Sequence, residues 1–306
     1  MTSERTRVIT LLDELQAAER AGAAALGEWA AGCRDPALRG GLQVLRARDA
    51  AHAALAEARL RALGGEPSAQ AGRNLQSLCS VLGTTDVSDR SKLTLLLSRF
   101  PDRVHDPFVH FAAQLSDEET RALLETIGDD ERASLRWLRE DAGGVAVAPP
   151  EDGRRGAAAV FMDALAAAES SGADVFDAWI AVCTIPGLRG GLRTAAARER
   201  THATLLVDRL HALGVAPTAT LPEPVRRAAL ARFGARDVSD EEKLGAIIAR
   251  YPHGHDPGVP IATAADELAP DLETRNVLRL VAAAETATIG WLRAYHAALT
   301  GGMRAG

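Results

Sequence analysis

The chain has 306 residues, of which 47% are hydrophobic, 25% charged and 4% aromatic. This composition is too apolar for a disordered chain, and at roughly 100 to 200 residues per domain the length predicts two domains. Acidic residues outnumber basic ones by 41 to 35, giving a net charge of -6, and no basic stripe offsets the excess, so nucleic acid is not an expected partner.

Alanine and leucine supply most of the apolar share, which favours helix over sheet. No apolar run reaches the roughly 18 residues that a membrane span requires, and the first residues contain no apolar signal segment. The three cysteines, Cys33, Cys79 and Cys183, form no CxxC pair. We therefore expect an all-α, cytoplasmic protein that does not contact membranes.

The first half of the chain has a helical period throughout. Pro36 begins the second helix and the glycines at 64–65 follow its end, the usual asymmetry of helix termini. Ser88 is a predicted N-cap, and Ser116 with Glu119 forms a predicted capping box for the last helix. The helices are expected over residues 5–32, 36–63, 68–83, 88–100 and 116–140. Three long helices and one broken helix predict a four-helix bundle.

The chain repeats itself. ALRGGL at 37–42 recurs as GLRGGL at 187–192, and DVSDRSKL at 86–93 matches DVSDEEKL at 237–244. All four tryptophans and both lysines fall in matched pairs. The two matches are offset by 150 and 151 residues, and self-similarity at a nearly constant offset indicates tandem duplication of one structural unit. The paired glycines of the RGG motif are expected to allow close helix packing.

A segment rich in glycine and proline joins the two repeats. The predicted organisation is therefore an N-terminal bundle over 1–142, a linker over 143–154 and a C-terminal bundle over 155–306. We expect the two bundles to pack on each other within the chain.

Charged residues interrupt the apolar stripe that should face each bundle interior. The first helix carries one acid on this stripe, the second an acid and a histidine three residues apart, and the last helix one more acid. Both repeats keep the pattern. The candidate metal-ligating residues are Glu19, Asp49, His52 and Glu131 in the first repeat and Glu169, Glu199, His202 and Glu285 in the second.

Ionised carboxylates in a dry core cost several kcal/mol each unless a positive group compensates. Shared protons or the buried arginines Arg48 and Arg198 are one possible compensation. A divalent metal is the other, because one ion satisfies several oxygen and imidazole ligands at once.

The pattern resembles the ferritin-like family, whose di-iron bundles carry Glu on one helix, Glu-x-x-His on the next, and Glu and Glu-x-x-His on the other two. The resemblance covers nearly the whole chain, once per repeat. It implies two tandem ferritin-like four-helix bundles related by duplication. By this resemblance Glu169 is the first-helix ligand, residues 199–202 are a full Glu-x-x-His and Glu285 is the acid of the last helix. The matching positions in the first repeat are Glu19, Asp49 with His52, and Glu131.

Two positions depart from the family pattern. Hydroxyls, Ser134 and Thr288, stand where the family has its second histidine. The third helix has two possible registers, which place either Asp89 and Asp240 or Arg90 and Glu241 on the inward face. A site reduced to one metal is therefore an alternative to a two-iron centre.

The resemblance implies a non-haem iron or manganese protein with oxygen- or peroxide-linked redox activity, more competent in the C-terminal bundle. The alternative is a metal-free scaffold or interaction protein in which the buried acids are vestigial. The sequence identifies neither a substrate nor a protein partner.

Overall fold

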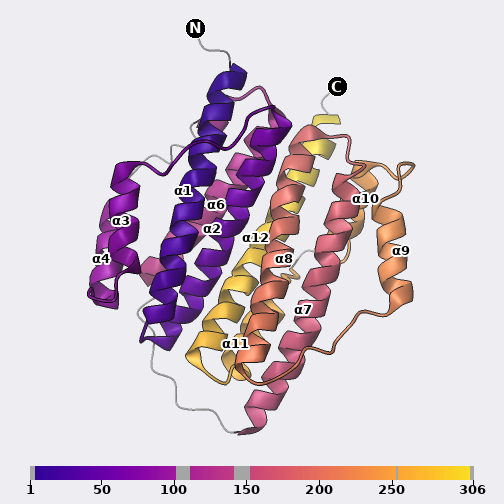
Figure 1. The fold of residues 1–306 in the computed structure, drawn as a ribbon. Coiled ribbons are helices and arrows are strands. Elements are labelled where there is room, and N and C mark those ends of the chain that lie inside the picture. The colour runs from indigo at the N-terminus through magenta and orange to yellow at the C-terminus, as the bar shows by residue number, and fades with distance from the viewer. Residues whose placement is uncertain (1–3, 101–110, 141–151, 253, 304–306) are drawn as a thin grey trace. The chain divides into compact units, whose positions relative to one another are not determined.

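The computed structural model describes residues 4–100, 111–140, 152–252 and 254–303, and every regular element in these ranges is an α-helix (Figure 1). The predicted all-α class is confirmed. Of the predicted linker, residues 143–151 lie outside the described residues. The helices are α1 (Glu4–Gly32), α2 (Pro36–Ala62), α3 (Arg73–Gly83), α4 (Asp89–Arg99), α6 (Glu118–Glu140), α7 (Asp152–Ile180), α8 (Pro186–Ala212), α9 (Glu223–Phe233), α10 (Asp240–Ile248), α11 (Gly258–Glu267) and α12 (Leu272–Met303).

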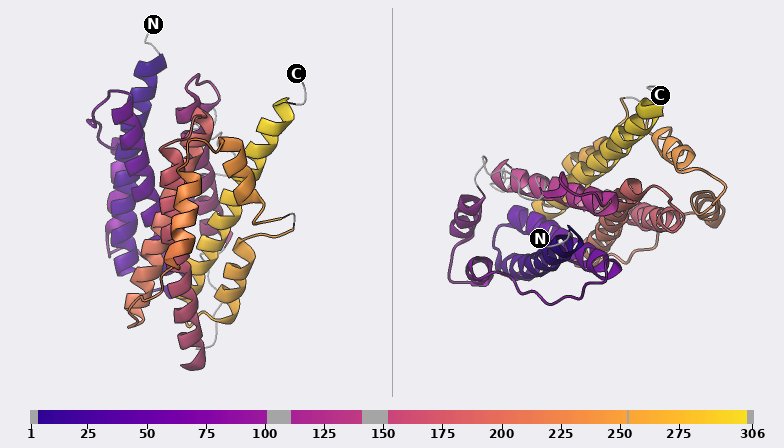
Figure 2. Two further views of the ribbon diagram at one scale, coloured as in Figure 1. Left: turned by 90° about the vertical axis from the view of Figure 1, so that its right-hand side faces the viewer. Right: turned by 90° about the horizontal axis from the view of Figure 1, so that it is seen from above.

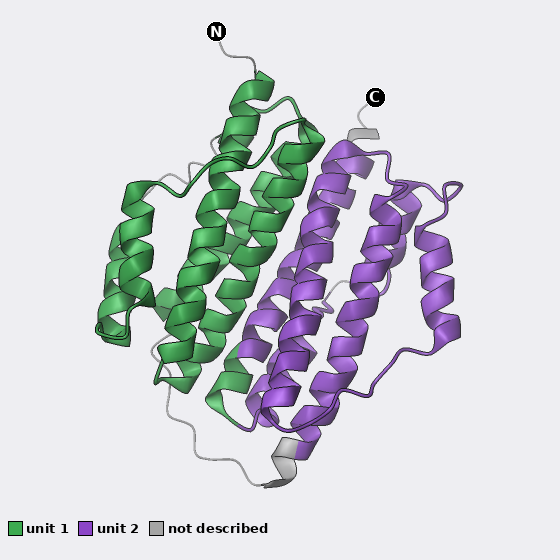
Figure 3. Ribbon diagram, viewed as in Figure 1, with its two compact units in different colours: residues 1–148, 271–276 green, residues 149–270, 277–306 purple. Residues whose placement is uncertain are grey.

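The chain divides into two compact units (Figure 3). The first comprises residues 1–148 and 271–276, and the second comprises residues 149–270 and 277–306. Matched helices have matched lengths, since α1 and α7 both have 29 residues and α2 and α8 both have 27. In the first unit the short helices α3 and α4 lie outside the pair of long helices α1 and α2 (Figure 2).

Local capping determines where several helices begin. The Asp35 carboxylate accepts hydrogen bonds from the first backbone amides of α2, and Pro36 follows at the first helical position. Ser88 caps α4, as its hydroxyl accepts from the Ser91 amide, so that prediction is confirmed. In the second unit Ser239 forms a reciprocal capping box with Glu242 at the start of α10.

The predicted capping box at Ser116 is wrong. The Ser116 hydroxyl and amide donate instead to the Glu4 carboxylate at the start of α1. The next residue, Asp117, accepts from the Thr120 amide, and α6 begins after it. Ser116 thus hydrogen-bonds with the Glu4 carboxylate of another helix, and the local spacing of residues does not reveal such a tertiary contact.

The third predicted helix starts later than expected, at Arg73 rather than residue 68. The Asp13 carboxylate accepts hydrogen bonds from the amides of Ser68 and Ala69 and from the Ser68 hydroxyl, which ties this segment to α1. Burial raises the pKa of Asp13, but these bonds outweigh it and lower the pKa to about 2. Asp163 holds Thr218 in the same way in the second unit.

Leucines form the core of the first unit. Leu12 of α1, Leu60 of α2 and Leu124 of α6 are completely buried in one cluster. Each such side chain stabilises the fold by about 1.5 to 3 kcal/mol. No described helix combines the length and the hydropathy needed to cross a membrane.

The glycines of the repeated RGG motif make room for tryptophan. A Cβ on Gly41 would overlap the Trp137 ring, and one on Gly191 would overlap the Trp291 ring. The prediction that these glycines allow close packing is therefore confirmed.

Candidate metal centre

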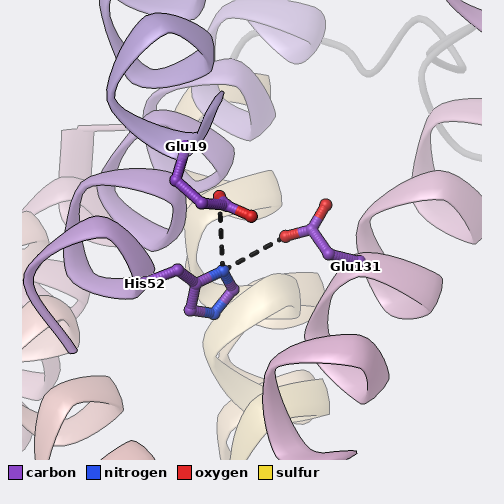
Figure 4. A group of neighbouring side chains, drawn as sticks. All are labelled: Glu19, His52 and Glu131. Atoms are coloured by element: carbon purple, nitrogen blue, oxygen red, sulfur yellow. Dashed lines mark ion pairs between the residues drawn. The ribbon is translucent and has the colours of Figure 1, made fainter. Parts of the chain in front are cut away.

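The charged residues of the inward stripes meet in the interior of each unit. In the first unit, ligand atoms of Glu19, His52 and Glu131 all lie within 4.8 Å of one another (Figure 4). In the second unit the same holds for Glu169, His202 and Glu285. Three helices contribute one residue each, as the spacing of the stripes predicts.

In the first unit the His52 ring lies among three carboxylates. Its Nδ1 atom is 3.7 Å from Glu19 Oε2 and 3.2 Å from Glu131 Oε1 (Figure 4). Its Nε2 atom hydrogen-bonds with Oδ2 of Asp130 at 3.2 Å. The ring is 2% exposed and Asp130 is 3% exposed, so the hydrogen bond between them is shielded from water.

In the second unit the His202 ring is 1% exposed. Its Nδ1 atom hydrogen-bonds with Glu169 Oε2 at 3.1 Å and lies 3.4 Å from Glu285 Oε1. The same nitrogen therefore faces the carboxylates in both units.

The second acid of each repeat lies beside these sets rather than inside them. The structure does not place Asp49 or Glu199 among the residues whose ligand atoms are mutually within 4.8 Å. A Cβ on Gly22 would lie 2.5 Å from Asp49 Oδ2, and one on Gly172 would lie 3.0 Å from Glu199 Cδ. Each acid thus occupies a notch that only glycine leaves open on the preceding helix.

The buried arginines lie at the positions that lack the second histidine. Arg48 Nη1 donates to the Ser134 hydroxyl at 3.3 Å, and Arg198 Nη1 donates to the Thr288 hydroxyl at 3.1 Å. Arg48 is 4% exposed and Arg198 is 7% exposed. A fixed positive charge therefore accompanies each cluster.

None of the acidic or basic residues that the two possible registers of the third helix would place inward belongs to the clusters. Asp89 accepts a hydrogen bond from the Trp29 indole at 2.8 Å, and Asp240 accepts one from the Trp179 indole at 2.7 Å. The alternative residues, Arg90 and Glu241, are exposed. The repeated aspartates anchor tryptophans, a packing role that the sequence left open.

The clusters change the protonation of their own members. Burial opposes charge on both histidines, but the neighbouring carboxylates raise the pKa of His52 well above its usual range and that of His202 to about 9. Burial and the nearby acids raise the pKa of Asp49 and Glu199 well above the ordinary value. Without a metal, the clusters are therefore held together by retained protons.

Several ligand atoms have no hydrogen-bond partner. His52 Nδ1, Glu131 Oε1 and Glu285 Oε1 are buried, and none makes a hydrogen bond among the described residues. Such atoms are rare in a folded core and call for an explanation. A cation fits this donor set, since carboxylate oxygen and imidazole nitrogen together suit iron, manganese and zinc.

Apolar layers enclose the second cluster on both sides along the helices. One core cluster joins α7, α8, α11 and α12, and another joins α7 to α10 and α12. On α7, Glu169 falls between Ala166 of the one and Phe176 of the other. On α12, Glu285 falls between Ala282 and Ile289. The polar cluster thus forms a single layer between two layers of the hydrophobic core, which limits the access of water.

Sequence reasoning missed Asp130. Its counterpart in the second repeat is Ala284, so a search for residues kept in both copies passes over it. The notch glycines were visible as small residues on the inward stripe in both repeats, but their contact with the acids required the structure. A scan against protein-family models and searches of curated proteins and of solved structures find no match to this chain.

Proposed function

We propose that each unit is a ferritin-like bundle that binds one divalent transition-metal ion. The ligands are Glu19, His52 and Glu131 in the first unit and Glu169, His202 and Glu285 in the second. The observation that carries the proposal is the convergence of ligand atoms from three helices, which in each unit lie within 4.8 Å of one another. Three of these atoms, His52 Nδ1, Glu131 Oε1 and Glu285 Oε1, are buried without a hydrogen-bond partner. Asp49 and Glu199 lie close enough to affect the charge of each cluster and are available as further ligands.

One ion per unit is favoured over two. The guanidinium groups of Arg48 and Arg198 bond to the hydroxyls that replace the second histidine. A second cation beside a buried arginine would meet a like charge at low dielectric, which is strongly unfavourable. Arginine thus supplies the charge that a second metal would provide.

The surrounding residues prepare the site for an ion. In the second unit apolar layers lie on both sides of the cluster along the helices and limit the access of water. In both units the helices hold the carboxylates near the histidine before binding. His202 and Glu199 give up protons when an ion enters, since metal ligands bind in their deprotonated forms. Iron or manganese in this position would supply redox chemistry with oxygen or peroxide.

The test is metal analysis of the full chain purified without chelators. We expect about two ions per chain, falling to about one in His52→Ala or His202→Ala and to none in the double variant. His211→Ala, an exposed histidine on the same helix α8, is the matched control and should keep both ions.

A metal-free scaffold is the second candidate. It is favoured by the retained protons and buried arginines, which neutralise the clusters without any metal. Sub-stoichiometric iron, manganese and zinc in the purified protein, with a thermal midpoint that added metal does not change, would establish this alternative.

A further inference from the structure

The two histidines are held differently. His52 Nε2 hydrogen-bonds with Asp130, while its Nδ1 has no hydrogen-bond partner. His202 instead uses Nδ1 for its hydrogen bond with Glu169. Position 284 of α12, which matches Asp130 in the repeat, is a buried alanine that has no side-chain acceptor.

We propose that Asp130 is a positioning residue that makes the first unit the tighter metal site. This inference rests on the proposed function, because it concerns the affinity of the same clusters. It reverses the order of the two sites expected from the sequence, where the full Glu-x-x-His favoured the second unit.

Asp130 fixes the orientation of the His52 ring. Its Oδ2 atom lies 3.2 Å from Nε2 and hydrogen-bonds with that nitrogen, which turns Nδ1 toward Glu19 and Glu131, where the ion would lie. When an ion binds Nδ1, the imidazole keeps its proton on Nε2, and a carboxylate that accepts from this N–H makes the ring a stronger ligand.

The second unit has no carboxylate at the corresponding position, because Ala284 replaces Asp130. The His202 ring is held through Nδ1, which hydrogen-bonds with Glu169. An ion that binds Nδ1 must break this bond, and position 284 supplies no carboxylate to hold the ring from the other side. Both differences reduce the affinity of the second site relative to the first.

Charge acts in the same direction. Glu19, Asp49, Asp130 and Glu131 surround His52 in the first unit, together with Arg48. In the second unit Glu169, Glu199 and Glu285 surround His202, together with Arg198. The first cluster therefore has one more acidic group to attract a cation.

The experiment measures Co²⁺ binding to the full chain by calorimetry, with visible absorption reporting nitrogen and oxygen ligation. His202→Ala isolates the first site and His52→Ala isolates the second. We expect tighter binding at the first site. Adding Asp130→Asn, which keeps the size but removes the charge, should weaken that site by about 10- to 100-fold, the usual loss when the carboxylate behind a metal-bound histidine is removed.

A gain in the other unit separates positioning from structure. Ala284→Asp in the His52→Ala background should tighten Co²⁺ binding at the second site, and this readout does not depend on Asp130→Asn folding. Circular dichroism of each variant tests for a retained fold.

The outcomes separate the two proposals. Binding at both sites with equal affinity, or tighter at the second, overturns the inference alone. The same holds if Asp130→Asn folds and changes the affinity less than twofold, or if Ala284→Asp folds and leaves the second site unchanged. The absence of Co²⁺ binding at either site overturns the proposed function as well.

Discussion

The glycine notch beside Glu199 offers a sharp test of the site. Gly172→Ala would place a Cβ 3.0 Å from Glu199 Cδ and closer still to its Oε2 atom. Ordinary contact between such atoms needs about 3.4 Å or more, so the carboxylate must move by several tenths of an ångström or turn away from its position. Glu199 is 9% exposed, so little room exists for the movement.

Glu199 is available as a further ligand of the second site, and ligand distances tolerate only about 0.2 Å of change. A displaced Glu199 can no longer take this role, and we expect the affinity of the second site to fall by about tenfold, equivalent to about 1.4 kcal/mol. The helix itself gains from the change, because alanine is favoured over glycine in a helix interior by about 0.5 to 1 kcal/mol. Stability of the metal-free protein should therefore remain close to the wild type.

The assay is Co²⁺ titration of Gly172→Ala in the His52→Ala background, with urea unfolding of the same protein without metal. Gly290→Ala is the matched control, since a Cβ there meets nothing within 4 Å. Unchanged affinity in Gly172→Ala would refute the role assigned to Glu199. Equal loss of affinity in both variants would show that the effect is not local to the notch.

Three further predictions concern protons and packing. The pKa of His202 is raised from 6.5 to about 9 in the folded protein, so the stability that this histidine contributes is complete below pH 6.5 and is lost as the pH rises toward 9. Urea titrations of the metal-free protein should therefore show a loss on the order of 3 kcal/mol of unfolding free energy between pH 6 and pH 9.5. Constant stability over this range would contradict the raised pKa of His202. The pKa values of Glu199 and Asp49 are also raised, so these acids hold protons in the metal-free protein at pH 7. Metal binding at pH 7 should release protons, which is measured as a calorimetric heat that depends on the buffer. Asp240→Ala and Asp89→Ala leave the indoles of Trp179 and Trp29 without an acceptor, and each should cost about 1 to 3 kcal/mol in urea unfolding; a loss in only one variant would show that the matched bonds are not equivalent.

Much of the fold follows from periodicity and capping. Helices α1, α2 and α4 lie close to their expected limits, because the apolar stripe of α1, Pro36 of α2 and the Ser88 cap of α4 act locally. The predicted capping box of the last helix was wrong because Ser116 bonds to Glu4, more than 100 residues away in the chain. Local patterns contain no information about such partners.

The site was predictable to the extent that burial follows helical phase. Glu169, His202 and Glu285 meet because each lies on the apolar stripe of its own helix. The role of Asp240 was not predictable, because a carboxylate on the third helix fits either a metal or the Trp179 indole. Asp130 could not be found through the repeat, because position 284 is an alanine.

The position of a bound ion would show whether each cluster is a site for one metal. Crystals of the full chain grown with Mn²⁺ would locate the ion by anomalous scattering. We predict a single peak in each unit, about 2 Å from the Nδ1 atom of His52 or His202 and from the nearby carboxylate oxygens, with Arg48 and Arg198 still bonded to their hydroxyls. Clusters without a peak, or two peaks in one unit with the arginine displaced, would contradict the account.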